Sequence, residues 1–252
     1  MGGAGTVSVI PLEGLPELVE GEDLALLVHA AAGAAGGLRD ADVVVVAQKA
    51  VSKVEGRVVR LAEVEASARA VELAGEDGDP RRAEVILRES REVLRSRPPL
   101  VIAETRHGFV CASAGVDSSN APEAGTLVLL PVDPDASAAR LRARLWELTG
   151  AEIAVIVSDS FGRAWRQGTT DVAIGCAGLE PLLDLHGERD ATGYELHATV
   201  IAVADELAGA AELVRGKLNR VPAAVVRGFG FEPSGEGTAR ELVIPPDRDL
   251  FR

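Results

Sequence analysis

The chain has 252 residues, of which 47% are hydrophobic, and a net charge of −13 with an isoelectric point near 4.8. The length allows one large domain or two small ones, and the apolar content is ample for a core. The acidic balance disfavours nonspecific binding to nucleic acid or to an anionic membrane.

Two further absences narrow the class of protein. No run of about 18 uncharged apolar residues occurs, so no membrane span is expected, and the start of the chain lacks the basic flank and apolar stretch of a secretory signal. Cys111 and Cys176 both lie in apolar, strand-like segments. We therefore expect a cytoplasmic protein with buried free thiols, and CxxC and HxxxH zinc spacings are absent.

The first part of the chain predicts a strand at residues 7–11 and a helix at residues 22–35. The turn between them, at residues 13–18, either leads simply into the helix or lines a ligand with its backbone. Four consecutive valines from Val43 then predict a strand buried on both faces.

A basic segment follows this valine strand and holds Lys49, Lys53 and Arg57. Three cations after a buried strand could form a phosphate cradle. A solvated basic turn is the simpler interpretation of the segment by itself. Neither GxxxxGK[ST] nor GxGxxG after a strand is present, so the sequence supports neither a P-loop nor a dinucleotide fold.

The middle of the chain predicts helices at residues 62–74 and 80–97, with Pro80 at the first helical position. Strands are expected at residues 100–103 and 109–113. The second strand leads to a cluster of Asp, Ser, Ser and Asn at residues 117–120. These side chains could share a metal ion or a sugar, or they could form an Asx-rich turn.

A strand at residues 126–132 and an Arg-rich helix at residues 135–149 precede the most site-like stretch. Apolar residues 153–156 run toward Ser158, Asp159 and Ser160, which is typical of a site at a strand end.

A polar segment at residues 162–171 follows, and it contains Arg163 and Arg166. Asp159 could hold a hard cation, and the two arginines could hold phosphate or carboxylate. The alternative is a hairpin with a solvated turn. Residues 172–176 predict the return strand.

The last part of the chain predicts a strand at residues 195–203, a helix at residues 205–214 and a buried strand at residues 223–227. The loop at residues 216–222 carries two more cations, and a short helix is expected near residues 236–243. Acid–hydroxyl clusters thus follow two strands, and basic segments recur along the chain. Carboxylate-held divalent ions with cations around phosphate oxygens are typical of phosphoryl transfer. No serine or cysteine stands in a nucleophile motif, so the residues indicate a metal-dependent enzyme that uses a phosphorylated substrate.

Six segments carry a specific resemblance: PLEGLPEL, VVVVAQKAVSKVEGR, RHGFVCASAGVDSSN, VIVSDSFGRAWRQGTTDVAIG, GERDATGYEL and VPAAVVRG. In this order they resemble the coenzyme F-420-0:L-glutamate ligase family, also called coenzyme F-420 gamma-glutamyl ligase, from residue 7 to about residue 250. The resemblance implies an α+β (mixed α/β) fold with mixed and antiparallel sheets flanked by helices, in an intertwined homodimer. We expect residues 1–252 to form a single module, undivided or with two subdomains, without the C-terminal nitroreductase-like domain that is fused to some relatives.

The resemblance also implies a reaction. GTP phosphorylates the lactyl carboxylate of coenzyme F-420-0, and the amine of L-glutamate attacks the acyl phosphate, releasing GDP and phosphate; further gamma-linked glutamates can follow. A pair of Mg²⁺ or Mn²⁺ ions is expected in each site, and K⁺ is a further candidate ion. Neither nucleic acid nor membrane is an expected partner.

The family's motifs assign roles to individual residues here. Metal ligands would be Asp117, Asp159 and Ser160, and the two aspartates are also catalytic, together with Arg163 and Arg166 as candidates chosen from the residues themselves. The nucleotide would contact Leu15, Pro16, Glu17, Leu18, Gln48, Lys49, Lys53, Asn120, Gly216, Lys217, Leu218 and Asn219. Lys217 stands where some relatives are expected to have an acid, which puts the second metal's ligands in doubt.

Two other functions remain compatible with the sequence. The chain could be a nucleotide-binding module that has lost catalysis and serves a partner protein, or an amide ligase for another carboxylate. The intact Asp117 and Asp159 argue against the first of these, whereas Lys217 leaves room for it.

Overall fold

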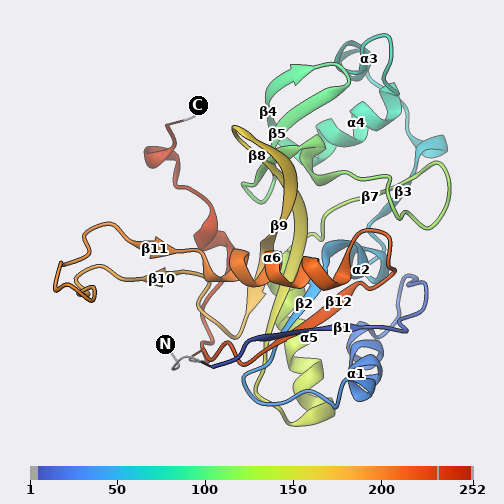
Figure 1. Ribbon diagram of the computed structural model, residues 1–252. Helices are drawn as coiled ribbons and strands as arrows, with labels where there is room; N and C mark the ends of the chain where they lie inside the picture. Colours follow the sequence, from blue (N-terminus) through green and yellow to red (C-terminus); the bar gives the residue numbers. More distant parts are fainter. Residues whose placement is uncertain (1–4, 232, 251–252) are drawn as a thin grey trace.

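The computed structural model describes residues 5–231 and 233–250, and its centre is a sheet with the strand order β1-β12-β2-β8-β9 (Figure 1). In that order the strands span Ser8–Leu12, Ala223–Arg227, Val43–Ala47, Ala154–Arg163 and Arg166–Ala177. β2 and β8 run parallel, whereas the other neighbouring pairs run antiparallel. This mixed sheet with its flanking helices confirms the predicted α+β class.

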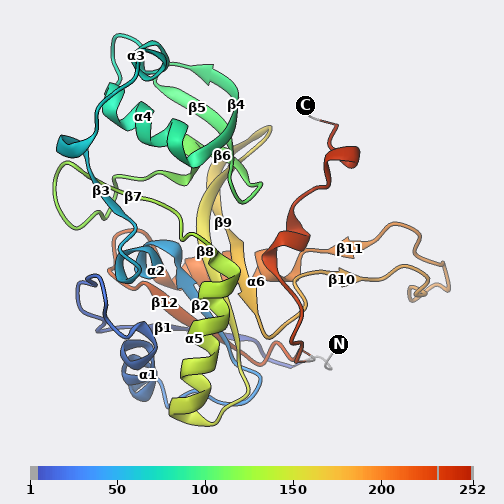
Figure 2. The same cartoon turned by 180° about the vertical axis from the view of Figure 1, so that it is seen from behind.

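Helices cover both faces of the sheet, with α1 and α5 on one side and α6 on the other (Figures 1 and 2). They span Leu24–Ala34, Pro134–Thr149 and Val203–Arg215. Successive side chains of a strand point to opposite faces. Val44 and Val46 therefore pack into the core with α1 and α5, while Val43 and Val45 pack into the core with α6. The valine strand is buried on both faces, as predicted.

A smaller lobe stands at one end of the sheet, above it in Figure 1. Its antiparallel sheet has the order β4-β5-β6, packs with α3 and α4, and shares a core with the separate β3–β7 pair. These elements span Ser90–Arg97, Leu100–Thr105, Val110–Ala112, Ala68–Ala74, Pro80–Glu89, Val58–Arg60 and Thr126–Val128. The lobe has its own core, in which Ile86, Val101 and Leu127 are buried.

An arm projects from the main body and is built on β10 (Leu183–Asp184) and β11 (Val200–Ile201) (Figures 1 and 2). The strand predicted at residues 195–203 is wrong over most of its length, because only Val200–Ile201 pair with another strand and an isolated bridge links Glu195 to Arg189. Short 3-10 helices span Leu61–Glu63, Ser113–Gly115, Ala239–Leu242 and Pro246–Arg248.

Two predicted helices are too long. The helix predicted at residues 80–97 ends at Glu89, and the chain continues as β4 because it pairs with β5 across the Pro98–Pro99 turn. The helix predicted at residues 62–74 begins only at Ala68, where the Ser67 hydroxyl accepts a hydrogen bond from the Ala70 N–H at 3.2 Å. In both cases tertiary pairing or a cap overrides a continuous amphipathic pattern.

Two predicted loops are regular structure instead. The basic segment after β2 is helix α2 (Gln48–Val54). The polar segment at residues 162–171 continues β8 and opens β9, so this segment forms a hairpin. Cys111 and Cys176 are buried free thiols, as predicted. Across the part of the chain that the structure describes, every helix is too short or too polar to cross a membrane.

Candidate functional site

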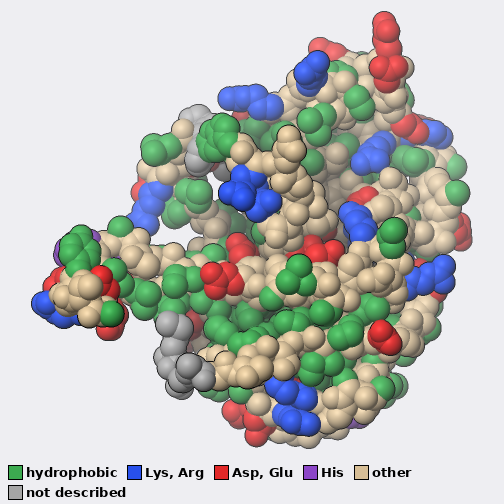
Figure 3. Space-filling view, in the orientation of Figure 1, with side chains coloured by type: hydrophobic (Ala, Val, Ile, Leu, Met, Phe, Trp, Pro, Cys, Tyr) green, Lys and Arg blue, Asp and Glu red, His purple; other side chains and the backbone are tan. Residues whose placement is uncertain are grey.

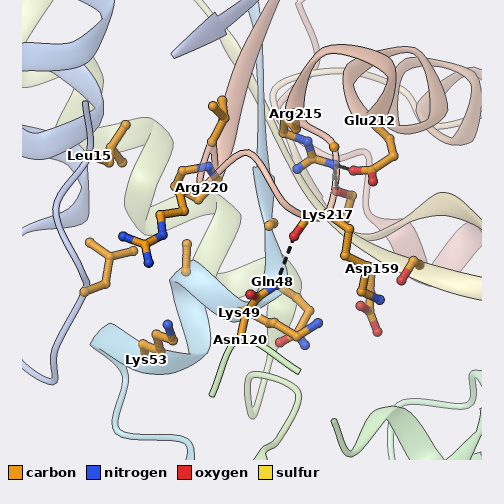
Figure 4. A pocket seen from close by; sticks show the side chains of 18 of the residues that line it. Leu15, Gln48, Lys49, Lys53, Asn120, Asp159, Glu212, Arg215, Lys217 and Arg220 are labelled. Carbon is orange, nitrogen blue, oxygen red and sulfur yellow. Dashed lines mark hydrogen bonds and ion pairs between the residues drawn. The ribbon is translucent and has the colours of Figure 1, made fainter. Parts of the chain in front are cut away.

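A pocket of about 540 Å³ lies at the carboxyl ends of β2 and β8 (Figure 4). Because these two strands are parallel and Ala47 is in register with Ser158, the residues that follow them meet at one edge of the sheet. The walls come from the 15–18 segment, α2, the Asn120 loop, the last turn of α6 and the loop after it. The surface is hollowed between the β8–β9 hairpin, the small lobe and α6, with acidic and basic side chains beside α6 (Figure 3). Segments far apart in the sequence thus build one cavity.

Asp117 lies beside the pocket and is connected to it by an ion pair with Lys49, which lines the pocket. The Lys49 Nζ lies 2.8 Å from the Asp117 Oδ2, and Ser119 donates its backbone N–H and its hydroxyl to the same carboxylate at 2.7 and 2.8 Å. Burial alone raises the pKa of Asp117, but the hydrogen bond and charge of Lys49 and the donors of Ser119 outweigh it and lower the pKa to about 2. Asp117 is therefore a carboxylate whose charge is already compensated, and Lys49 itself lines the pocket.

Asp159 lies on the pocket wall and has the opposite electrostatic balance. Burial raises its pKa to about 7, and the nearby charges of Asp171 and Asp117 reinforce that shift. Lys49 and the Ser160 N–H oppose the shift without overcoming it. Asp117 and Asp159 therefore lie within electrostatic reach of each other and act on the same lysine, whereas Asp159 lacks enough positive charge around it.

The donors around Asp159 suit a hard divalent cation. Asp117, Asp159 and Ser160 offer carboxylate and hydroxyl oxygens, and Asp159 is a desolvated carboxyl that a nearby cation would stabilise. Over residues 5–231 and 233–250, no three His, Cys, Asp or Glu side chains come together as a metal cluster. Mg²⁺ is typically held by one or two carboxylates with substrate phosphates and water, so the donor set fits an ion whose shell a phosphorylated ligand completes.

Helix α2 lines the pocket with Gln48, Lys49 and Lys53. The Ser52 hydroxyl donates to the Gln48 Oε1 at 2.8 Å, and the buried Gln48 Nε2 has no hydrogen-bond partner among the described residues. The amide donor of Gln48 is therefore unpaired at the pocket wall. Lys53 forms an ion pair with Glu17 of the 15–18 segment, which ties that segment to α2.

The loop after α6 forms the opposite wall. Gly216 has a φ of +59°, and a Cβ there would lie 2.6 Å from the Asn219 side chain, so the turn favours glycine. The Asn120 side chain donates to the Lys217 carbonyl at 3.3 Å, which joins this loop to the Asp117 segment (Figure 4). Among the predicted contacts in this loop, Gly216 and Lys217 line the pocket, whereas Leu218 and Asn219 are exposed outside its lining.

The sequence predictions do not include a buried charge cluster that lines the pocket near Asp159. Arg215 forms ion pairs with Asp171 and Glu212 and donates to the Ser158 hydroxyl at 2.9 Å, and all four residues line the pocket. Its sequence signal was available, because Arg215 stands on the apolar stripe of α6, four residues after the buried Ala211. Arg220, one of the two cations in the loop at residues 216–222, also lines the pocket.

Arg163 and Arg166 lie elsewhere. They end β8 and begin β9 at the tip of the hairpin, both are exposed, and neither is among the residues that line the pocket. The structure thus brings Asp159, Ser160, Asn120, α2 and the 15–18 segment to one cavity, with Asp117 beside it, and places the two arginines along the hairpin.

Acidic oxygens, several basic side chains and a cavity at the ends of parallel strands together define a binding site for an anionic small molecule. The sequence profile of the family described as F420-0:Gamma-glutamyl ligase matches residues 14–228. The chain therefore belongs to this family, which confirms the resemblance found in the motifs.

The similarity to individual proteins extends over nearly the whole chain. A protein named Coenzyme F420:L-glutamate ligase from Methanothermobacter thermautotrophicus is 44% identical over 250 residues, covering 98% of this chain and 99% of the relative. The proteins of the same name from Methanopyrus kandleri and Archaeoglobus fulgidus are 44% and 42% identical, and they cover 100% and 98% of this chain. The similarity thus includes both the sheet that positions the pocket and the small lobe.

Proposed function

We propose that this protein is a GTP-dependent amide ligase that joins L-glutamate to coenzyme F-420-0. Family membership and the names of the full-length relatives support the glutamate and deazaflavin substrates. The observation that carries the nucleotide-dependent chemistry is the Asp117–Lys49–Asp159 arrangement beside a pocket rich in cations. Such an arrangement stabilises charge on transferring phosphoryl groups.

The proposed reaction has two steps. An oxygen of the acceptor carboxylate attacks the γ-phosphorus of GTP, the bond to the β-phosphate oxygen breaks, and an acyl phosphate and GDP result. The glutamate amine then attacks the acyl carbon, loses a proton and expels inorganic phosphate, which leaves the amide. The transient acyl phosphate must be shielded from water, because hydrolysis would waste the nucleotide.

The chain's own residues hold the reactants in this scheme. Lys49, Lys53, Lys217 and Arg220 line the pocket and neutralise phosphate oxygens, while the 15–18 segment borders the base. Asp117, Asp159 and Ser160 would hold Mg²⁺ or Mn²⁺. The bound ion supplies charge stabilisation at the phosphoryl oxygens and a template for their orientation.

Phosphate release measured in a full set of reactant omissions tests the proposal. With GTP, Mn²⁺, L-glutamate and coenzyme F-420-0 we expect phosphate release together with a product that is heavier by a glutamyl residue. GTP binding without turnover would instead support the non-catalytic module. Turnover only with a different carboxylate acceptor would support the other amide ligase.

The homodimer implied by the resemblance is also part of the proposal. Light scattering coupled to gel filtration tests it directly: a mass twice that of the 26.2 kDa chain is expected, and a mass equal to that of one chain would contradict it.

A further inference from the structure

The acids that line the pocket differ in whether a cation of the protein already compensates them. The lining contains four acidic side chains, and three of them form ion pairs with pocket-lining cations: Glu17 with Lys53, and Asp171 and Glu212 with Arg215. Asp159 is the fourth, and it has no ion pair with a described residue. The pocket wall thus offers one uncommitted carboxylate, with the Asp117 carboxylate beside it.

The Asp171–Arg215 pair is not available to a metal ion at low cost. The two side chains are 6% and 2% exposed, and the Ser158 hydroxyl donates to the Asp171 Oδ2 at 2.8 Å. Arg215 donates to its partners through Nη2, while its buried Nε and Nη1 have no hydrogen-bond partner among the described residues. A metal ion that took Asp171 would leave this guanidinium buried without its main counter-ion, and breaking a buried ion pair in this way is strongly destabilising.

Basic side chains surround the acids on this side of the pocket. Figure 4 shows Lys217 on the same side of the pocket as Asp159 and Glu212. Burial raises the pKa of Glu212, and three positive charges oppose that rise, those of Arg215, Lys217 and Lys49. All three cations therefore lie within electrostatic reach of the Glu212 carboxylate. A divalent ion at Glu212 would meet their repulsion in a partly buried site, where charges are screened less than at the surface.

Lys217 is held in place by its backbone, whereas its ammonium is unpaired. The Asn120 side chain donates to the Lys217 carbonyl at 3.3 Å, and Asn120 follows Asp117 in the same loop. A left-handed turn at Gly216 precedes Lys217. The Lys217 ammonium has no ion pair with a described residue. It is therefore available to a phosphate oxygen, on a loop that is joined to the segment carrying Asp117.

We infer that the pocket binds one divalent cation with the nucleotide, instead of the pair that the family resemblance implies, and that the Lys217 ammonium takes the place of the second ion. The inference rests on the proposed function, because it takes a nucleotide and a metal ion as occupants of the pocket. The single ion would lie at Asp117, Asp159 and Ser160. The second positive charge at the phosphate oxygens would come from Lys217.

Coordination chemistry favours this division. Two-ion sites place their ions about 3.5–4 Å apart around the transferring group, and each ion needs oxygen ligands of its own. The other acids of the pocket are committed to Arg215 and Lys53, so a second ion lacks carboxylates. A lysine is a compact charge with three rotatable donors, so it neutralises a phosphate oxygen without any carboxylate.

The number of bound ions tests the inference directly. The full chain is dialysed to equilibrium with saturating GDP and Mn²⁺, and the bound manganese is counted by mass spectrometry. We expect one Mn²⁺ for each chain, with the electron paramagnetic resonance spectrum of an isolated ion. Two Mn²⁺ for each chain, or a spectrum broadened by a neighbouring manganese, would overturn the inference.

Lys217→Glu supplies the carboxylate that a second ion needs. This variant should bind two Mn²⁺ for each chain, and its affinity for GDP should continue to rise with Mn²⁺ after the first ion is bound. Arg220→Glu is the matched control, because it reverses the same charge in the same loop, and Figure 4 places Arg220 on the other side of the pocket, near Leu15. The control should keep one Mn²⁺. The same number of ions in the two variants would overturn the assignment of Lys217.

Lys217→Met removes the charge and keeps an unbranched apolar stem. It should weaken the binding of GDP with Mn²⁺ about tenfold or more, the scale of a lost charge-assisted contact, and additional Mn²⁺ should not restore the affinity. The ion count should stay at one. Wild-type affinity for GDP in this variant would show that Lys217 does not contact the phosphates, and the inference would be wrong.

The outcomes also separate this inference from the proposed function. If the wild-type protein ligates glutamate and binds two Mn²⁺ for each chain, the ligase stands and the inference is wrong. If the wild-type protein binds one Mn²⁺ and Lys217→Glu binds two, while no acceptor is ligated, the inference stands and the ligase proposal fails. Binding of GDP without any Mn²⁺ would contradict both.

Discussion

The loop around Asp117 and the end of β8 around Asp159 present the same residue types, an aspartate followed by serine, yet their electrostatic states are opposite. Asp117 has a Lys49 ion pair and two donors from Ser119, and its pKa falls to about 2. Asp159 is desolvated, and its pKa rises to about 7. The protein compensates the charge of Asp117, whereas an ionised Asp159 in the folded protein costs free energy.

This difference shows which of the two carboxylates a bound cation would stabilise more. A buried carboxylate without enough compensating charge is stabilised by a cation, so the binding energy of an ion at Asp159 offsets a cost already present in the folded protein. Lys49 is near both acids, and it can neutralise phosphate oxygens when an ion takes over at the carboxylates. In the proposed metal site, Asp117 of the loop would be the ligand whose charge the protein already compensates, and Asp159 of the strand end would gain most from the ion.

The largest expected effect is on catalysis at Asp159. Asp159→Asn should reduce turnover roughly a thousandfold or more, because a metal carboxylate is worth several kcal/mol of charge stabilisation. Phosphate-release kinetics measure the loss, and circular dichroism checks that the fold survives. A rate near that of the wild type in a folded variant would remove Asp159 from the metal site.

Arg215→Met tests the buried ion pair that lines the pocket near Asp159. Asp171 is buried in an ion pair with Arg215, so the variant leaves an uncompensated carboxylate and should lower the free energy of unfolding by about 3 kcal/mol. Urea unfolding measures this change in the free energy of unfolding. The double variant Arg215→Met/Asp171→Asn should recover most of the loss, and an equal loss in both variants would mean that Arg215 acts through packing alone.

Lys53→Ala tests the nucleotide wall on α2. The variant should raise the KM for GTP about tenfold with little change in kcat, because it removes one charge contact to the bound nucleotide. The matched control is Arg60→Ala, since Arg60 is exposed in the small lobe and pairs with Glu63. An unchanged nucleotide KM in Lys53→Ala would exclude Lys53 from the site.

The smallest effect is on stability against pH in chelator-treated protein. The folded-state pKa of Asp159 is raised from 3.8 to about 7, so the folded protein loses stability as the pH rises from about 4 to 7, and the cost is complete above that range. The Asp159→Asn variant has no carboxyl to ionise at this position, so its stability does not fall over this pH range. Its melting temperature should match the wild type near pH 4 and exceed it by about 2–4 °C at pH 8, a change of ~1 kcal/mol once solvent screening of a pocket-lining carboxyl is allowed for.

Asp117→Asn should behave in the opposite way. The folded-state pKa of Asp117 is lowered from 3.8 to about 2, so its carboxylate stabilises the fold above pH 4, and that contribution disappears as the pH falls toward 2. The variant should therefore melt below the wild type at pH 7 and match it under strongly acidic conditions. Shifts of the same sign in both variants at neutral pH would contradict the contrast between the two acids.

Sequence patterns predicted the buried strands of the central sheet, because β2, β12 and the start of β8 are apolar runs, whereas the polar hairpin formed by the end of β8 and the start of β9 was expected as a loop. The valines of β2 and the apolar start of β8 are typical of a strand buried on both faces, and both are buried in the structure. Asp159, which follows the apolar start of β8, and Asp117, which follows β6, were also recognisable from their positions after strands. The small lobe was harder, since β4 carries charges with helical spacing and becomes a strand only by pairing with β5.

The residues of the pocket wall could not be predicted from the sequence, because they come together only in the folded structure. Arg215 and Asp171 are 44 residues apart, and each alone is an ordinary charged residue in an amphipathic element. Their burial together becomes visible only when α6 packs on β9. Likewise, the Asn120 contact to the Lys217 carbonyl spans 97 residues, a separation over which sequence periodicity gives no information.

The central claim is that Asp117 and Asp159 share a cation that binds the nucleotide's phosphates. A crystal structure with GDP and Mn²⁺, read by the anomalous scattering of manganese, tests it most directly. We predict an anomalous peak between the two carboxylates, in contact with both and with a phosphate oxygen, and a Lys49 ammonium turned toward the phosphates. Ordered GDP in the pocket with manganese absent, or bound away from either aspartate, would contradict the account.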